Sequence, residues 1–140
     1  MALELSSLQK AVSALAGVLA KSDDAEFMSS VDEVAHNAIR AGVIQHFEFT
    51  YELCWKFIKR WLETNVSATA IDGVTRRELF RLAAESRLID DVEQWMRYHE
   101  ARNLTSRTYQ PEVAARVYAT AHDFAPDAAR LLAALEARND

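Results

Sequence analysis

The fold is decided by one segment, Val43-Ile-Gln-His-Phe-Glu-Phe-Thr-Tyr-Glu-Leu-Cys-Trp-Lys-Phe-Ile-Lys-Arg-Trp-Leu62, which is apolar on most sides when it is drawn as a helix. A helix that is apolar nearly all round lies in the centre of a bundle and contacts neighbours on several faces. In a chain of 140 residues, some of these faces would be covered by a second subunit. The segment therefore predicts a central helix and a homodimer.

Helical periodicity extends outward from this segment in both directions. Apolar residues recur every three or four positions over residues 5–19 and 113–135, which predicts an amphipathic helix at each end of the chain. Residues 24–29 predict one short turn. Pro111 suits the first position of the last helix, whereas Pro126 falls inside it and predicts a kink or a split.

Capping signals place the remaining helix starts. Three pairs have the spacing of a capping box: Ser30 with Glu33, Thr75 with Glu78, and Asp90 with Glu93. The central helix would start near residue 31 and run to about Glu63, with a bend or break near Gly42. Residues 64–74 predict a loop that turns at Asp72-Gly73. The helix after Asp90 would continue to Gln110, where the following proline ends it.

Composition agrees with an all-helical chain. Half of the residues are hydrophobic, 26% are charged, and the chain has only three glycines and two prolines. So few turn-forming residues disfavour an all-β fold. We expect one domain over residues 1–140, an all-α antiparallel up-and-down four-helix bundle with a short extra helix.

Charge and cysteine content exclude several classes of function. The net charge of −5 disfavours non-specific nucleic-acid binding through overall charge. The single cysteine, Cys54, rules out an intramolecular disulfide and lies in an apolar helical run.

No apolar run reaches the roughly 18 residues that a membrane span needs. With no secretion-signal pattern at the start, we expect a cytoplasmic protein that binds no membrane.

A second segment, Trp95-Met-Arg-Tyr-His-Glu-Ala-Arg-Asn-Leu-Thr-Ser-Arg-Thr-Tyr109, begins as an amphipathic helix and then turns polar. Its apolar side continues, at helical spacing, into polar residues: Arg102, Asn103, Thr105, Ser106 and Tyr109. Polar side chains on the side of a helix that faces the protein interior are costly to bury unless they form hydrogen bonds or ion pairs. The stretch is therefore either a satisfied polar network or a site.

Two motifs in these segments resemble those of a known family. The pattern Gln-x-Phe-Glu-x-Thr-x-Glu-Leu-x-Trp-Lys is matched from Gln45 to Lys56. The pattern Arg-Asn-Leu-Thr-Ser-His-Thr-Tyr is matched from Arg102 to Tyr109, except that Arg107 stands where the family has histidine. With both motifs in this order, the chain resembles the HEPN superfamily of helical proteins, in its nucleotidyltransferase substrate-binding protein branch.

The resemblance implies a dimeric helical bundle encoded beside a minimal nucleotidyltransferase, in pairs several of which behave as toxin–antitoxin systems. In such pairs the helical protein is the toxin, a metal-independent ribonuclease whose Arg-x4-His pairs meet at the dimer interface. In related pairs the nucleotidyltransferase neutralises the toxin by adding AMP to the tyrosine after the histidine. By position, Arg102 would bind phosphate, Asn103 would be the adjoining polar residue, and Tyr109 would accept AMP.

Arg107 is the departure that matters for activity. Metal-independent RNA cleavage needs a base that takes the proton of the ribose 2′-hydroxyl, and neutral imidazole does this near neutral pH. A guanidinium has a pKa above about 12 and no acceptor, so Arg107 can hold phosphate but cannot be the base. His99, one helical turn before Arg102, is the alternative base, although packing beside Trp95 is the simpler interpretation.

Other charged residues near the motifs have two interpretations. Glu48, Glu52 and Lys56 follow one another at four-residue steps, which is typical of a charge ladder on a helix face. Within so apolar a helix, they are also candidates for pairing with Arg102 or Arg107. The other histidines have no metal-ligand spacing, and we expect no metal or cofactor.

Three functions are compatible with the sequence. The preferred one is a helical partner of a minimal nucleotidyltransferase that binds nucleotide or RNA phosphate, has a degenerate ribonuclease motif, and offers Tyr109 for modification. The second is an active metal-independent ribonuclease toxin. The third is a non-catalytic helical oligomerisation module.

Overall fold

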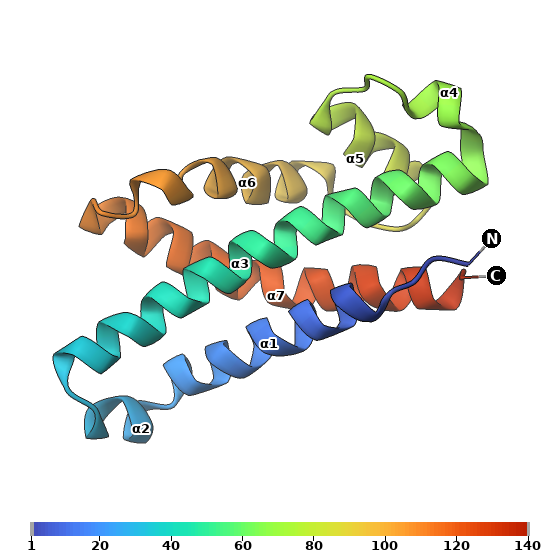
Figure 1. Ribbon diagram of the computed structural model, residues 1–140. Helices are drawn as coiled ribbons and strands as arrows, with labels where there is room; N and C mark the ends of the chain where they lie inside the picture. The colour runs from blue at the N-terminus through green and yellow to red at the C-terminus, as the bar shows by residue number, and fades with distance from the viewer. Residues whose placement is uncertain (1, 140) are drawn as a thin grey trace.

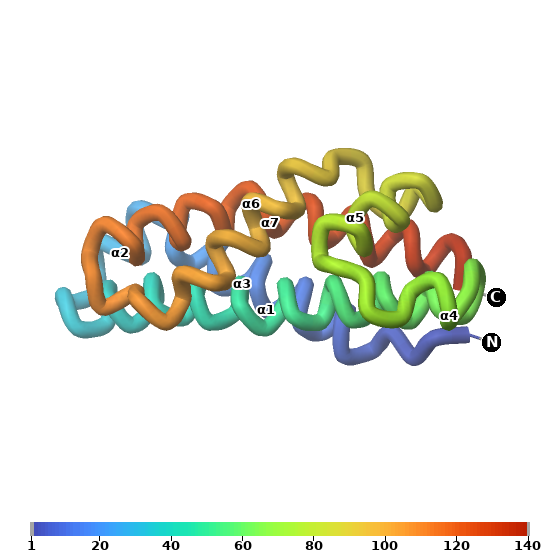
Figure 2. The backbone as a smooth tube through the Cα atoms, turned by 90° about the horizontal axis from the view of Figure 1, so that it is seen from above, coloured from blue at the N-terminus to red at the C-terminus, as the bar shows by residue number. Residues whose placement is uncertain are grey.

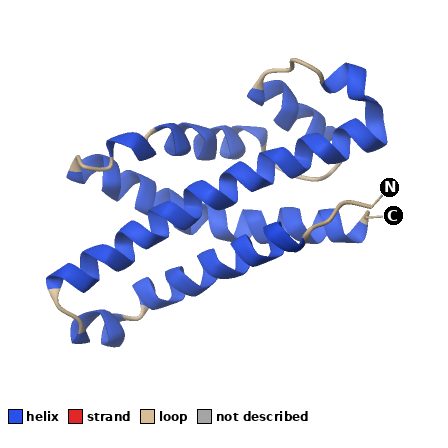
Figure 3. Cartoon of the chain, viewed as in Figure 1, coloured by secondary structure: helices blue, strands red, loops and turns tan. Residues whose placement is uncertain are grey.

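The computed structural model describes residues 2–139, and within this range every regular element is a helix (Figures 1 and 3). The all-α class predicted from the sequence is confirmed. The elements, in chain order, are α1 (Ser6–Asp23), α2 (Ala25–Ser30), α3 (Glu33–Leu62), a π-helical turn η1 (Glu63–Ser67), α4 (Ala68–Ile71), α5 (Arg76–Glu85), α6 (Val92–Asn103), a 3-10 turn η2 (Thr105–Arg107) and α7 (Pro111–Ala137).

The four long helices α1, α3, α6 and α7 run in alternating directions along the molecule (Figure 1). Helix α3 is the central one, since it packs against α1, α5, α6 and α7. Figure 2 shows α4 and α5 at the end of the bundle where both termini lie. There Leu3 and Asn139 exchange two hydrogen bonds of 2.6 and 2.9 Å. None of the helices within residues 2–139 is long and apolar enough to cross a membrane.

An aromatic cluster fills the core where α3, α6 and α7 meet. The ring of Phe124 on α7 lies 5.1 Å from that of Phe47, 5.0 Å from Tyr98 and 5.8 Å from Trp95, each edge to face. Phe47, Tyr98 and Phe124 are fully buried. Edge-to-face pairs of this kind add to the hydrophobic gain of burial, so the cluster fixes how α6 lies on α3.

Two of the three predicted capping boxes are displaced. Thr75 caps α5 as predicted, since its hydroxyl accepts from the Glu78 N–H. Helix α3, however, is capped by Asp32, because α2 continues through Ser30. Helix α6 is capped by Asp91 rather than Asp90. Spacing alone does not separate neighbouring candidates for a cap, because each site is set by where the preceding segment stops.

The predicted break at Gly42, the predicted split at Pro126 and most of one predicted loop are wrong, whereas the bend and the kink at these two positions stay predictions. Helix α3 passes Gly42 without a break, supported along its length by α1 and α7. Helix α7 continues through Pro126, whose position is exposed to solvent. Most of the predicted loop 64–74 is helical, in η1 and α4, and only its turn at Asp72-Gly73 is as expected, with a positive φ of 74° at the glycine.

Helix α6 is shorter than predicted. It ends at Asn103 instead of Gln110, and the chain then makes successive tight turns. The Leu104 N–H donates to the Ala101 carbonyl, and the Arg107 N–H donates to the Leu104 carbonyl. Arg102 and Asn103 therefore lie in the last turn of α6, and Thr105 to Tyr109 lie in the turns that follow it.

Candidate functional site

The C-terminal end of α6 is bound to the middle of α3 by an ion pair. The Arg102 Nε donates to Glu52 Oε1 at 2.5 Å, and both side chains are half-buried. The other carboxylate oxygen of Glu52 accepts from the Trp55 indole N–H at 2.8 Å. Burial alone would raise the pKa of Glu52, but the hydrogen bonds from Trp55 and Arg102 hold it below its ordinary value. Glu52 is thus ionised and oriented at neutral pH.

A second glutamate of α3 holds the turn after α6. Glu48 lies one helical turn before Glu52, and its Oε2 lies 2.6 Å from the Thr105 hydroxyl oxygen. The same hydroxyl lies 2.7 Å from the Arg102 carbonyl oxygen, and its single proton can go to only one of these two acceptors at a time. A side chain that satisfies a carbonyl at the end of a helix stabilises the turn there. Glu48 and Glu52 together place Arg102 and Thr105.

His99 is part of a buried polar chain. Its Nδ1 lies 2.9 Å from the hydroxyl oxygen of Tyr51 on α3, and that oxygen accepts from Arg76 Nη1 at 3.1 Å. Because arginine only donates, the Tyr51 hydroxyl proton has His99 Nδ1 as its acceptor among the described contacts. The hydrogen bond from Tyr51 therefore favours the His99 tautomer with its proton on Nε2. Asn103 Nδ2, 3.5 Å from Nε2, is itself a donor, so this tautomer requires the Asn103 amide to turn its oxygen toward the ring.

Burial and the neighbouring cations keep His99 neutral. Desolvation, followed by the charge of Arg76, lowers the pKa of His99 below its ordinary value. Burial also raises the pKa of Tyr51 to about 12, against the opposing effect of the Arg76 hydrogen bond. At neutral pH, His99 presents an N–H donor at Nε2 rather than a free lone pair. This tautomer suits binding of an anion and does not suit general-base chemistry.

The remaining motif residues are on the surface. Asn103, Ser106 and Arg107 are exposed, and the Arg107 side chain makes no hydrogen bond or ion pair with residues 2–139. Lys56 is also exposed, with its Nζ 5.8 Å from the centre of the Trp55 ring. The structure thus brings together Arg102, Thr105, Glu48 and Glu52, and leaves Arg107 and Lys56 outside this network.

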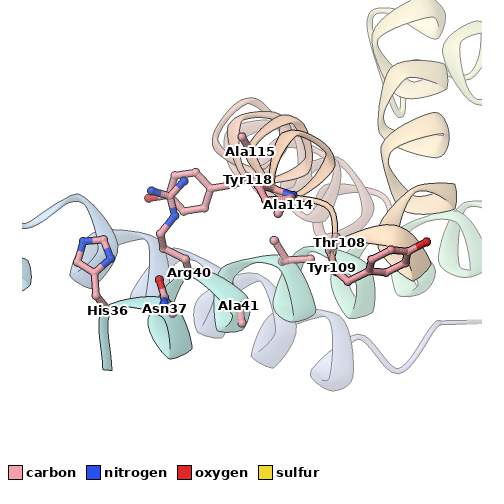
Figure 4. A pocket seen from close by; sticks show the side chains of 11 residues that line it. His36, Asn37, Arg40, Ala41, Thr108, Tyr109, Ala114, Ala115 and Tyr118 are labelled. Carbon is pink, nitrogen blue, oxygen red and sulfur yellow. The ribbon is translucent and has the colours of Figure 1, made fainter. Parts of the chain in front are cut away.

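Tyr109 is the most exposed aromatic residue, with 78% of its surface accessible. Its hydroxyl oxygen accepts only from the neighbouring Gln110 side chain, at 3.3 Å. In Figure 4 its ring points away from a hollow of about 540 Å³ between the starts of α3 and α7, where the Arg40 guanidinium stacks on Tyr118. The Tyr109 hydroxyl is therefore open to a second macromolecule.

Two contributors to the site were missed in the sequence. Tyr51 lies within the apolar central segment, and nothing in the sequence indicates that its hydroxyl binds a histidine. Arg76, the first residue of α5, was not singled out, although it joins Tyr51 and stacks on Trp55. Only the packing of α5 beside α3 brings Arg76 here, and no local motif indicates it. Residues 2–139 contain no group of three or more metal-ligating side chains.

Two histidines provide a pH test of these contacts. In NMR titrations, the ring resonances of His99 will titrate at a lower pH in the folded chain than in the urea-unfolded chain. His122 will behave in the opposite way: burial alone would lower its pKa, but its contacts with Asp23 and the Tyr118 carbonyl raise it. The contribution of His99 to stability is complete above the unfolded value, about 6.5, and is lost as the pH falls below it.

For His122 the sign is reversed. Its contribution is complete below the unfolded value and is lost as the pH rises through its raised folded value. If His99 titrated at or above its value in urea, burial and the charge of Arg76 would not be what keeps the ring neutral.

Known proteins resemble the chain along nearly its whole length. A curated relative from Haemophilus influenzae, "Probable ribonuclease HepT", is 33% identical over 138 residues, which is 98% of this chain and 94% of the relative. A solved H. influenzae structure, described as the fold of a substrate-binding domain of a nucleotidyltransferase, matches with a TM-score of 0.91 and 32% identity. That match covers 95% of this chain and 99% of the other.

A solved structure from Thermus thermophilus matches less closely, with a TM-score of 0.68 and 25% identity over 89% of this chain and 98% of the other. Residues 3–137 match the family described as "Nucleotidyltransferase substrate binding protein like". This match spans α1 to α7 and includes both motifs and the Glu52–Arg102 pair. The chain therefore belongs to the nucleotidyltransferase substrate-binding protein family.

Proposed function

We propose that the chain is the helical partner of a minimal nucleotidyltransferase, the toxin-like component of a toxin–antitoxin pair, with a degenerate ribonuclease motif. The observation that carries the proposal is the arrangement of the motif. Arg102 is held by Glu52 beside α3, while Tyr109 presents an exposed hydroxyl seven residues later. The name of the solved H. influenzae relative, a nucleotidyltransferase substrate-binding domain, supports such a partner.

Tyr109 is the proposed acceptor of AMP. Of the four tyrosines, Tyr51 and Tyr98 are fully buried, and Tyr118 is half-buried with its hydroxyl bonded to Ser22. An acceptor must reach the active site of another protein, and Tyr109 is the tyrosine whose exposure permits this. In the transfer, its hydroxyl oxygen would bond to the α-phosphorus of ATP, pyrophosphate would leave, and the phenolic proton would be lost.

Co-expression with the neighbouring nucleotidyltransferase tests this role. We expect a complex on gel filtration and, in the presence of ATP, a gain of one AMP in intact mass. Tyr109→Phe will abolish the gain, because the phenolic oxygen is the attacking atom. Tyr118→Phe is the matched control and will leave it unchanged. A chain that forms no complex and gains no mass would instead be the non-catalytic helical module.

The absence of a base accounts for the proposed loss of ribonuclease activity. Arg107 has no acceptor atom, and the proton on His99 Nε2 prevents that nitrogen from acting as the base. The phosphate-binding groups of the motif remain, because Arg102 is in place and Arg107 is exposed. The name of the curated relative, a probable ribonuclease, indicates what the intact motif would do.

Restoring the family histidine should therefore create activity. We expect Arg107→His to cleave single-stranded RNA without added metal, with a rate at least about a hundredfold above the wild type, the usual contribution of a positioned general base. Arg116→His, at an exposed arginine on α7, is the control. Strong cleavage by the wild type that His99→Gln removes would establish the second function, an active ribonuclease toxin.

We also propose that the chain forms a homodimer over the exposed face of α3. One chain already covers most of the apolar residues of this helix, but Phe49 remains 53% exposed. Phe49 lies three residues before Glu52, the partner of Arg102, on the same face of α3, so a second copy placed here would bring two Arg102 side chains toward one groove. Large exposed aromatic residues are typical of the centres of interfaces.

Light scattering at micromolar concentration tests the dimer. We expect twice the chain mass for the wild type and the monomer mass for Phe49→Glu, since burying an unpaired carboxylate in the interface is costly. Val66→Glu, on the exposed turn η1, should remain dimeric. A wild-type monomer would contradict the proposal.

A further inference from the structure

A cavity of about 390 Å³ lies beside the candidate site and includes His99 in its lining. It is bounded by the second half of α3, the α4–α5 loop, the start of α5 and α6. Its polar wall is formed by Lys59, Arg76 and His99, and Ile71 and Leu79 form a buried apolar floor. A small cavity that combines apolar walls with a few convergent polar groups is typical of a ligand site.

Positive charge in this cavity is not neutralised by the protein. Within residues 2–139, neither Arg76 nor Lys59 has a carboxylate within ion-pair distance. The next arginines of α5 differ, because Arg77 pairs with Glu93 and Arg81 pairs with Glu78 and Glu85. Arg76 and Lys59 are also half-buried, so water screens them less than it screens surface cations. The cavity therefore favours an anion.

The guanidinium of Arg76 is held in a fixed orientation. Its central carbon lies 3.8 Å from the centre of the Trp55 ring, and its Nη1 donates to the Tyr51 hydroxyl. Trp55 is itself fixed by its hydrogen bond to Glu52. The other N–H groups of Arg76 remain available as donors, in the planar arrangement that matches phosphate oxygens. A donor already ordered before binding loses less entropy when the ligand arrives.

His99 belongs to the same wall. Because Nδ1 accepts from Tyr51, the ring carries its proton on Nε2. The lining of the cavity thus combines a guanidinium and an ammonium with apolar side chains that suit a sugar or base, while the Nε2 of His99 lies at Asn103, outside the lining. Charge-assisted hydrogen bonds from arginine and lysine are the usual means of holding a phosphate group.

We propose that this cavity binds the phosphate of a nucleotide, through Arg76 and Lys59, at a subsite separate from the Arg102–Tyr109 motif. The nucleotide is either free or the terminal residue of an RNA strand. The site requires neither modification of Tyr109 nor cleavage of RNA. The proposed phosphate site can therefore be correct or wrong whether or not the chain has the nucleotidyltransferase partner proposed above.

Calorimetric titration of the purified chain with AMP and with adenosine tests the site. AMP should bind about tenfold or more tightly than adenosine, because only AMP carries the phosphate. Arg76→Gln and Lys59→Gln should each weaken AMP binding about tenfold, the usual effect of losing one charged hydrogen bond. Arg77→Gln, which removes a neighbouring but paired arginine, is the matched control and should change the affinity by less than about twofold.

Two further measurements make the result decisive. Arg76 also donates a hydrogen bond to Tyr51, so circular dichroism is needed to check that Arg76→Gln is folded. If Arg76→Gln unfolds, the affinity of Lys59→Gln for AMP becomes the test of the site. Titration with short RNA that carries either a 5′-phosphate or a 5′-hydroxyl distinguishes a free nucleotide from an RNA end as the ligand. If the chain prefers the phosphorylated RNA and does not bind AMP, the ligand is the RNA end. Equal binding of AMP and adenosine with no preference between the RNAs, or full affinity in both variants, would overturn the proposal.

Discussion

The carboxylate of Glu52 is the contact on which the candidate site depends. One oxygen binds Arg102 at the end of α6, and the other binds the indole of Trp55. Trp55 in turn supports the guanidinium of Arg76, which reaches the Tyr51 hydroxyl. A single ionised group in the middle of α3 thereby connects the last turn of α6 to the first turn of α5, two segments that share no local sequence signal.

This arrangement explains why an apolar central helix carries two glutamates. A half-buried arginine without a partner is costly, and so is a half-buried carboxylate. Glu48 and Glu52, one turn apart, satisfy a hydroxyl and a guanidinium at the point where α6 stops. Replacing either glutamate by an apolar residue would leave its partner beside the core without compensation. The pairs set the geometry more than they add to stability, since both remain partly screened by water.

Most of the fold follows from periodicity, and the site does not. The aromatic positions of α3 predicted a central helix, and Asp72-Gly73 predicted a turn that has a positive φ at the glycine. The starts at Ser30 and Asp90 were misplaced because adjacent polar residues compete for the same cap. The end of α6 was misplaced because Glu48 stabilises the turn from another helix. These outcomes are decided by tertiary contacts, which local spacing does not encode.

In the candidate site too, some residues are indicated by local sequence and others only by tertiary contacts. Arg102, Asn103 and Tyr109 were identified from a linear motif, and the Glu52–Arg102 pair was one of two interpretations of a charge ladder. Arg76 lies 26 residues before Arg102 in the sequence numbering and joins the site only through the packing of α5. Its role depends on a ring face and a hydroxyl from two turns of α3. A residue of this kind becomes visible only when the helices are assembled.

The hydrogen-bonded ends of the chain have a practical consequence. Leu3 and Asn139 hold the two termini together at one end of the bundle, whereas the connection between α6 and α7, which carries Tyr109, lies at the opposite end (Figure 1). A fluorophore, affinity tag or surface tether attached at either terminus would therefore stand well clear of the tyrosine. The molecule can be immobilised for partner capture from either end in the same orientation, with Tyr109 pointing into solution.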